Sequence, residues 1–140
     1  ISRFAEAGVN DAGIAVLQNV QVEVADLEGD QLAVAFFGLI LIDRDAAGQG
    51  FFVDQTPRDD LEFQTATGQA LIAAAEGRVG LLTVLTHELG HLLGLEHNEE
   101  DPLNAMADPL PPGVRRTLRE ADLAALDAAF QSDRLQDSLP

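Results

Sequence analysis

All three histidines of the 140-residue chain lie within eleven residues, in the stretch HELGHLLGLEH that runs from His87 to His97. Residues four apart on an α-helix project from the same face, so His87 and His91 can bind one metal ion if this stretch is helical. Gly94 allows a left-handed turn that would end the helix and bring the chain back. His97 can then become a third ligand. The fold must therefore place a helix and the turn after it around one point.

The segment from Gly80 to Leu93 has the apolar spacing of a helix. Its leucines follow one another at intervals of three or four residues: Leu82, Leu85, Leu89 and Leu92. We expect this stripe to be buried on the side of the helix opposite the histidines. Glu88 directly follows the first histidine, where its carboxylate can reach a water molecule on the metal.

Three protein ligands with one open position are typical of a catalytic zinc site rather than a structural one. Zinc lowers the pKa of its bound water toward about 7 and polarises a carbonyl oxygen. The pattern therefore predicts peptide-bond hydrolysis through a zinc-bound water, with Glu88 as the general base and then the general acid. HExxH alone also occurs by chance, but the glycine and third histidine extend it to HExxHxxGxxH, a much more specific pattern.

The first part of the chain predicts helices followed by strands. Residues Ile1 to Asn19 read as a helix interrupted near Gly8 to Asn10. The alternation in Val20 to Leu27 predicts a half-buried strand, and the apolar run from Leu32 to Asp43 predicts one or two buried strands with a break at Gly38.

The second part has fewer regular signals. Asp43 to Phe63 is loop-rich, with a short strand expected at Gly50 to Val53, and the alanine-rich segment 65–77 is ambiguous but could be helical. A capping box at Thr117 to Glu120 predicts the start of a final helix. Its buried stripe would be Leu123, Leu126 and Phe130. We expect a single catalytic domain at residues 1–132, followed by an exit linker at 133–140.

The chain is strongly acidic, with 24 acidic and 8 basic residues and a net charge of −16. This balance argues against binding to nucleic acid or to anionic membranes, which lysine and arginine mediate. Cysteine is absent, and no apolar run is long enough to span a membrane. The N-terminal residues lack the features of a signal peptide, so we expect any export signal to lie outside this fragment.

Acidic loops raise the question of calcium. Asp43, Asp45 and Asp54 are the candidate ligands, because nearby glycines permit tight wrapping of the backbone around an ion. Acidic loops that are simply solvated are the alternative, and no EF-hand pattern is present. Glu99, Glu100 and Asp101 follow the zinc signature. They would either disfavour acidic substrates or form a charge cluster without a role.

The zinc signature, followed by Met106 in the segment NAMAD, resembles the metzincin clan of zinc metallopeptidases. The resemblance implies that His87, His91 and His97 bind the zinc and that Met106 forms the Met-turn, an apolar floor under the histidines. Met106 as ordinary core filler is the alternative. Within the clan the chain is most similar to the matrixins and related bacterial domains, because GQGFFVDQTPRDDLEF resembles the matrixin segment in which an edge strand precedes an acidic stretch.

The resemblance implies an α/β fold of the α+β type: a twisted mixed sheet of about five strands, an active-site helix and a C-terminal helix. A polypeptide substrate would lie extended beside the edge strand formed by Gly50, Phe51, Phe52 and Val53, with a pocket shaped by residues 107–114. The chain also departs from the matrixin pattern. No histidine remains for a second, structural zinc, and Asn98 stands where matrixins commonly have serine.

These features lead to three functional hypotheses. The first is a secreted zinc endopeptidase, present as a monomeric module of a larger protein. The second is a module that cuts only its parent chain. The third is a non-enzymatic, zinc-stabilised interaction module, which the intact Glu88 argues against, because a purely structural site has no use for that base.

Overall fold

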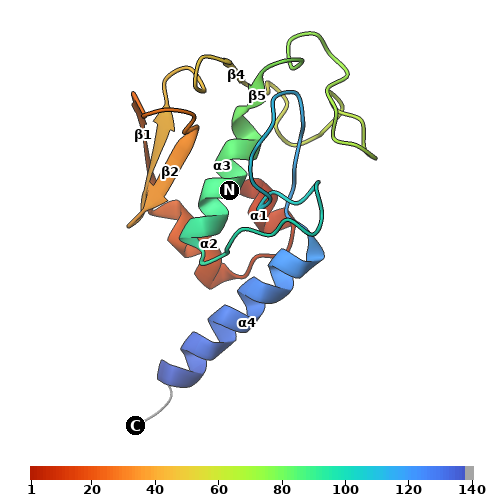
Figure 1. Ribbon diagram of the computed structural model, residues 1–140. Coiled ribbons are helices and arrows are strands. Elements are labelled where there is room, and N and C mark those ends of the chain that lie inside the picture. The colour runs from red at the N-terminus through yellow and green to blue at the C-terminus, as the bar shows by residue number, and fades with distance from the viewer. Residues whose placement is uncertain (138–140) are drawn as a thin grey trace.

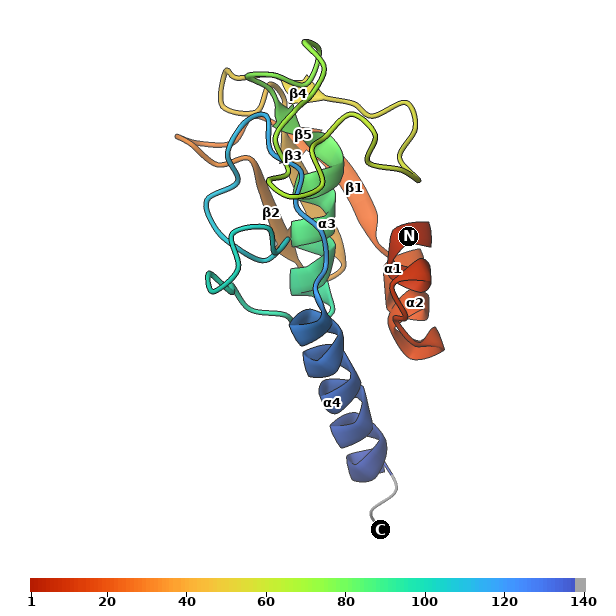
Figure 2. The same ribbon diagram turned by 90° about the vertical axis from the view of Figure 1, so that its right-hand side faces the viewer.

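The computed structural model describes the backbone of residues 1–137 and the side chains of residues 1–128. Helix α3 (Leu81–Leu92) lies at the centre of the molecule (Figures 1 and 2). It contacts strands on one side and helix α2 on another. Its buried positions include Thr83, Val84 and Gly90, whereas the predicted leucine stripe is only partly buried.

Two short helices precede the sheet, as the sequence predicts. Helix α1 (Ser2–Glu6) ends before Gly8, whose φ of 103° breaks the helix. Helix α2 (Asp11–Gln18) begins at Asn10, whose side-chain oxygen accepts a hydrogen bond of 2.9 Å from the Gly13 N–H.

A mixed sheet packs against α3. Its strands β1 (Gln21–Ala25), β2 (Ala33–Phe36) and β3 (Leu39–Asp43) are arranged in the order β1-β3-β2, with β1 parallel and β2 antiparallel to β3. Phe37 and Gly38 form the two-residue turn between β2 and β3, and both have positive φ angles, as a type I′ hairpin requires. The predicted break at Gly38 is this turn.

Burial in this sheet is uneven. Ile40 and Ile42 of β3 are buried, but the side chains of β1 are largely exposed, with Val24 at 67% of its full accessible surface. The prediction of a half-buried β1 is therefore wrong. The reason is its position: β1 lies at one edge of the sheet, whereas the strand that α3 contacts is β2, at the other edge.

The described residues form five strands, but these are divided between two sheets rather than joined in one. Strands β4 (Phe51–Phe52) and β5 (Val79–Gly80) pair in parallel, and β5 leads directly into α3. The predicted fold class is nevertheless confirmed, because the structure is α+β with a twisted mixed sheet, a central helix and a C-terminal helix (Figure 1).

Segment 65–77 contains turns and isolated bridges, not the helix that its alanines allow. Gly68 explains part of this difference. It has a φ of +70°, and a Cβ atom there would lie 2.4 Å from the carbonyl oxygen of Arg115. Two backbone hydrogen bonds, from the Arg115 N–H to the Gly68 carbonyl and from the Ala70 N–H to the Gly113 carbonyl, hold the segment against a later part of the chain.

Helix α4 (Glu120–Asp137) begins at Glu120, the last residue of the predicted capping box (Figure 2). Thr117 lies before the helix in a parallel β-bridge with Asn104, where its N–H donates to the Leu103 carbonyl and its carbonyl accepts from the Ala105 N–H. The Asp122 carboxylate accepts a 2.8 Å hydrogen bond from the Arg119 N–H at the start of the helix. Leu126 is buried in the main core and Leu123 packs against that core, whereas the side chain of Phe130 lies outside the described residues.

The predicted exit linker at 133–140 begins within a helix, and its role as a linker stays a prediction. Residues 133–137 continue α4, since no glycine or proline interrupts the sequence before Pro140. Residues 138–140 lie outside the described residues, and the domain boundary remains a prediction. Among the helices that the structure describes, none has both the length and the apolar composition that crossing a membrane requires.

Candidate metal centre

The structure brings the three predicted ligands together. His87 and His91 lie one turn apart on α3, and their Nε2 atoms are 3.0 Å from each other. His97 joins them from the segment after the helix. One ligand atom from each of the three side chains falls within 4.8 Å of the others.

The chain reverses after α3 through a regular helix-ending motif. The Leu95 N–H donates to the Gly90 carbonyl and the Gly94 N–H donates to the His91 carbonyl, which together form a Schellman motif. Gly94 has a φ of 98°, a backbone angle that residues with a side chain rarely adopt. This turn is what allows His97 to face the two helical histidines.

Hydrogen bonds to backbone carbonyls orient two of the rings. Nδ1 of His87 donates to the Ala105 carbonyl at 2.7 Å, and Nδ1 of His91 donates to the Leu95 carbonyl at 2.8 Å. Because a carbonyl can only accept, these bonds assign the proton to Nδ1 in each ring. Both Nε2 atoms are then unprotonated, and their lone pairs face each other. A cation between them fits this arrangement, and three imidazole nitrogens with an open position suit zinc.

Met106 packs against Gly90, the residue of α3 directly before His91. Its side chain is fully buried, and a Cβ atom built on Gly90 would lie 2.5 Å from the Met106 sulfur. The segment that contains Met106 is tied to the histidine loop, since the Asn98 N–H donates to the Met106 carbonyl at 3.0 Å. Met106 also belongs to the main core cluster, which agrees with the alternative of a core residue, and its role as a Met-turn under the histidines stays a prediction.

Glu88 shares the cavity of the histidines and is itself only 8% exposed. Burial raises the pKa of its carboxyl to about 7; the charge of His97 opposes this shift, and that of Asp108 adds to it. Burial also lowers the pKa of His87, although the hydrogen bond to Ala105 opposes it. A neutral His87 is the form that can bind a metal ion.

The cavity has a volume of about 590 Å³. Its walls come from the turn before β2, from β2 itself, from α3 and from the loop after Met106. The lining residues outside the metal centre include Asp30, Gln31, Leu32, Ala33, Val34, Ala35, Gln49, Asp108, Pro109 and Leu110. The predicted contribution of loop 107–114 thus reduces to Asp108, Pro109 and Leu110.

The predicted substrate strand is not beside this cavity. Gly50, Phe51, Phe52 and Val53 are absent from its lining, and the last three face a separate cavity. The reason is pairing: β4 joins β5, whereas β2 forms the wall beside the histidines. We therefore correct the strand at the candidate cleft from Gly50–Val53 to β2.

The three candidate calcium ligands do not converge either. Within the described residues, the histidines are the one group of three or more such side chains close enough to share an ion. The two carboxylate oxygens of Asp43 accept hydrogen bonds from the N–H groups of Ala47 and Leu27, and one oxygen of Asp45 accepts from Gly48. These loops are held by backbone donors.

Asp54 has a different partner. It pairs with Arg115 at 2.8 Å, and both side chains are at most 3% exposed. Burial alone would raise the pKa of Asp54, but the hydrogen bonds and charge of Arg115, together with the Thr56 N–H, lower it below the ordinary value. The Arg115 guanidinium also lies 4.3 Å from the centre of the Phe63 ring. Nothing in the sequence pattern signals this buried pair.

The acidic residues after His97 lie away from the cavity lining. Asp101 accepts from the Leu103 N–H and pairs with Arg119 at 3.1 Å, and Glu100 faces a cavity next to α4. Glu99 is exposed and does not line the histidine cavity. Apart from Glu88, the acidic side chains that line the histidine cavity are Asp30 and Asp108. The sequence patterns do not single out either of them.

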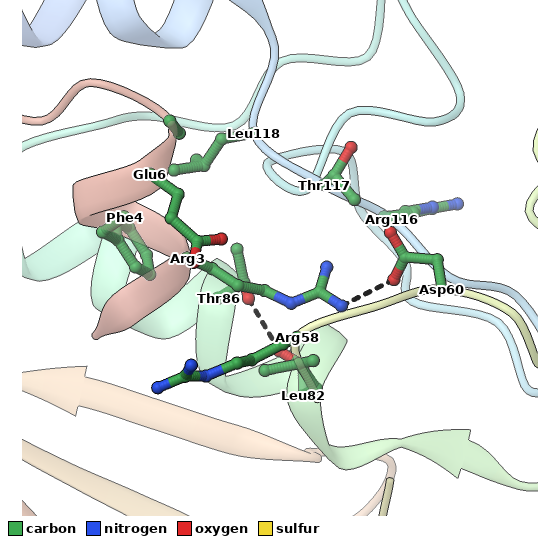
Figure 3. Close-up of a pocket in the computed structure, with 11 residues that line it drawn as sticks. Arg3, Phe4, Glu6, Arg58, Asp60, Leu82, Thr86, Arg116, Thr117 and Leu118 are labelled. Atoms are coloured by element: carbon green, nitrogen blue, oxygen red, sulfur yellow. Dashed lines mark hydrogen bonds and ion pairs between the residues drawn. The ribbon is translucent and has the colours of Figure 1, made fainter. Parts of the chain in front are cut away.

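Another cavity, distinct from that of the histidines, lies between α1 and α3 and is shown in Figure 3. Arg3 reaches from α1 to Asp60, with a 2.7 Å ion pair that fastens α1 to the loop before segment 65–77. Arg58 and Arg116 also line this cavity, but their guanidinium groups point away from Arg3 (Figure 3). These arginines therefore do not form a convergent anion site.

Comparison with known proteins agrees with this geometry. The model of the matrixin family of peptidases matches residues 22–130, well over half of the chain, and this range includes the sheet, the histidines and Met106. A search of curated proteins gives no match. The chain belongs to the matrixin family of zinc metallopeptidases.

Proposed function

We propose that this chain is a zinc-dependent endopeptidase that uses Glu88 as general base and general acid. The observation that carries the proposal is the meeting of three imidazoles and one carboxylate in a single cavity lined by an edge strand. When bound, zinc supplies Lewis-acid activation of water and of the substrate carbonyl.

Glu88 would move the protons of the reaction. Its carboxylate accepts a proton from the attacking water and then delivers it to the departing amine, so that one residue serves both halves of the hydrolysis. The carbonyls of Ala105 and Leu95 keep the rings of His87 and His91 in the orientation and tautomer that ligation needs.

Strand β2 is the proposed platform for a polypeptide substrate. Among the described residues it pairs only with β3, so the backbone groups on its other edge are available. An extended peptide could add to this edge through main-chain hydrogen bonds while its scissile bond faces the histidines. This mode recognises peptide backbone, which fits an endopeptidase.

We further propose that the domain acts outside the cell as a monomeric module of a larger protein. Membership of the matrixin family supports an extracellular setting. The net charge of −16 disfavours nucleic acid and anionic membranes as partners.

The test measures zinc and turnover together. We expect one zinc per chain by elemental analysis and cleavage of an unstructured protein such as denatured casein. Glu88→Gln keeps the shape of the side chain but removes the base, and it should lower kcat/KM by about 100- to 10,000-fold while zinc remains bound. Glu99→Gln, the same change at an exposed site outside the cavity, is the matched control.

Activity of Glu88→Gln at the level of the unchanged protein would refute the proposal. Cleavage confined to the flanks of a longer chain would support a self-processing module instead. Zinc-dependent melting without turnover of any peptide would support a non-enzymatic interaction module.

A further inference from the structure

The ionisable side chains that line the cavity, apart from the histidines, are all acidic. They are Asp30, Glu88 and Asp108, and no lysine or arginine is among the described lining residues. Glu88 already has a role in the proposed reaction. The other two carboxylates have no role in it. They line the cavity beside β2, the strand proposed to bind the substrate peptide.

Asp108 occupies a fixed position in the cavity wall. Nη1 of Arg116 donates to the carbonyls on both sides of it, to Ala107 at 2.8 Å and to Pro109 at 2.7 Å. The Arg116 N–H is in turn bound to the Thr83 hydroxyl of α3 at 3.2 Å. The backbone at Asp108 is therefore clamped to the active-site helix.

The Asp108 carboxylate is left available for a ligand. Within the described residues it has no hydrogen-bond or ion-pair partner, and its side chain is exposed. Arg116 directs its guanidinium to backbone carbonyls and lines the cavity of Figure 3 rather than that of the histidines. The clamp thus holds the loop in place without placing a cation in the histidine cavity.

Asp108 is also near the reacting centre, because it lines the same cavity as Glu88 and the three histidines. Burial is the main cause of the raised pKa of Glu88, and the charge of Asp108 adds to it. The same charge acts on His87. A substrate side chain close to the scissile bond would therefore experience this carboxylate.

We propose that Asp108, assisted by Asp30, determines specificity by favouring peptides with lysine or arginine beside the scissile bond. This inference rests on the proposed function and names its substrate class. An exposed carboxylate attracts a cationic side chain modestly and repels an anionic one, so the expected effect is a bias between substrates rather than an absolute requirement.

The experiment compares three peptides that differ only in one residue beside the bond cleaved in casein: Lys, Gln or Glu. We expect kcat/KM to fall in that order. In Asp108→Asn, the ratio of the Lys to the Gln peptide should fall by about threefold to fivefold. The bias of the unchanged protein should also shrink as salt rises from about 0.05 M to about 0.5 M, because the Debye length shortens.

Two controls separate the local effect from the general acidity of the chain. Asp127→Asn makes the same charge change on the exposed face of α4, outside every described cavity, and should leave the ratio unchanged. Asp30→Asn should lower it less than Asp108→Asn does, in keeping with the assisting role proposed for Asp30.

A binding measurement keeps this inference distinct from the proposed function. Zinc-loaded Glu88→Gln, with and without Asp108→Asn, is titrated against the same labelled peptides by fluorescence anisotropy. Binding that favours Lys only when Asp108 is present supports the inference even if no peptide is cleaved. Equal ratios with and without Asp108, in cleavage and in binding, would overturn it while leaving the peptidase proposal standing.

Discussion

Asp43 is a candidate metal ligand in the sequence, but in the structure both of its carboxylate oxygens accept hydrogen bonds from backbone N–H groups. Its side chain is 3% exposed, and its two oxygens accept from Leu27 at 2.9 Å and from Ala47 at 2.8 Å. These hydrogen bonds lower the pKa of Asp43 to about 2, and the bond from Ala47 contributes more than the bond from Leu27. The charged carboxylate therefore fastens the end of β3 to two loops.

Asp43→Asn should reveal a pH-dependent contribution to stability. Because the folded pKa lies below the unfolded value of about 4, the stabilisation is complete above about pH 4 and is lost as pH falls toward 2. The variant should be less stable than the unchanged protein at pH 7, and the difference should disappear near pH 2. Urea unfolding at several pH values measures this, with exposed Asp26→Asn as the control. A difference that stays constant with pH would contradict the explanation.

At the scale of elements, Arg115 joins parts of the fold that are distant in sequence. It pairs with Asp54 and, at 2.8 Å, with Asp60, which in turn pairs with Arg3 of α1. Removal of one partner from a buried pair leaves an uncompensated charge. This network therefore fixes α1 and the loop after β4 against the segment that leads to α4.

Arg115→Met should lower the free energy of unfolding by about 3–5 kcal/mol, because Asp54 would remain buried without its partner. Arg119→Met is the matched control. Arg119 pairs with Asp101 near the surface, with side chains 38% and 46% exposed, so its loss should cost no more than about 1 kcal/mol. Denaturant unfolding of the two variants gives the comparison. Equal losses would show that the buried position of Arg115 is unimportant.

Elements with local causes could be predicted from the sequence, and elements with distant causes could not. The apolar spacing before Gly94 predicts α3 and its end, and Gly38 predicts the break between β2 and β3, because each signal lies within the element. The sequence predicts Gly50–Val53 beside the cavity, where the structure has β2, since strand pairing depends on contacts far apart in sequence. Segment 65–77 is ambiguous in the sequence for the same reason, because its hydrogen bonds to Gly113 and Arg115 come from a distant part of the chain.

The candidate site shows the same division. HExxHxxGxxH contains all three predicted ligands within eleven residues, so a local pattern is sufficient to predict that they lie together. The carbonyl of Ala105 that orients His87, and the carboxylate of Asp108 in the cavity wall, come from a loop that only the tertiary structure brings to α3. No residue type or spacing marks either of them.

At the scale of the whole molecule, the histidines lie next to the main core. Leu93, Leu95 and Met106 belong to the same buried cluster as Phe4 and Leu126. Zinc bound to the histidines should therefore stabilise the entire fold. At a free concentration one hundred times its dissociation constant, it should add about 2.7 kcal/mol to the free energy of unfolding.

Calorimetry with zinc and after chelation should show this difference as a lower Tm of the metal-free protein. His97→Ala should weaken zinc binding and make the Tm less dependent on zinc than that of the unchanged protein. A Tm that does not respond to zinc in the unchanged protein would contradict the assignment of the histidines as a metal centre.

The Schellman turn at Gly94 also affects the structure of the protein after it has lost its metal ion and before it binds another. It orders the path from His91 to His97 by backbone hydrogen bonds alone, and the carbonyls of Ala105 and Leu95 hold two of the rings. An ion that bridges so short a loop restricts few conformations of the unfolded chain. The domain should consequently keep its architecture when emptied, so that zinc can be withdrawn and replaced, or exchanged for cobalt, without a cycle of refolding.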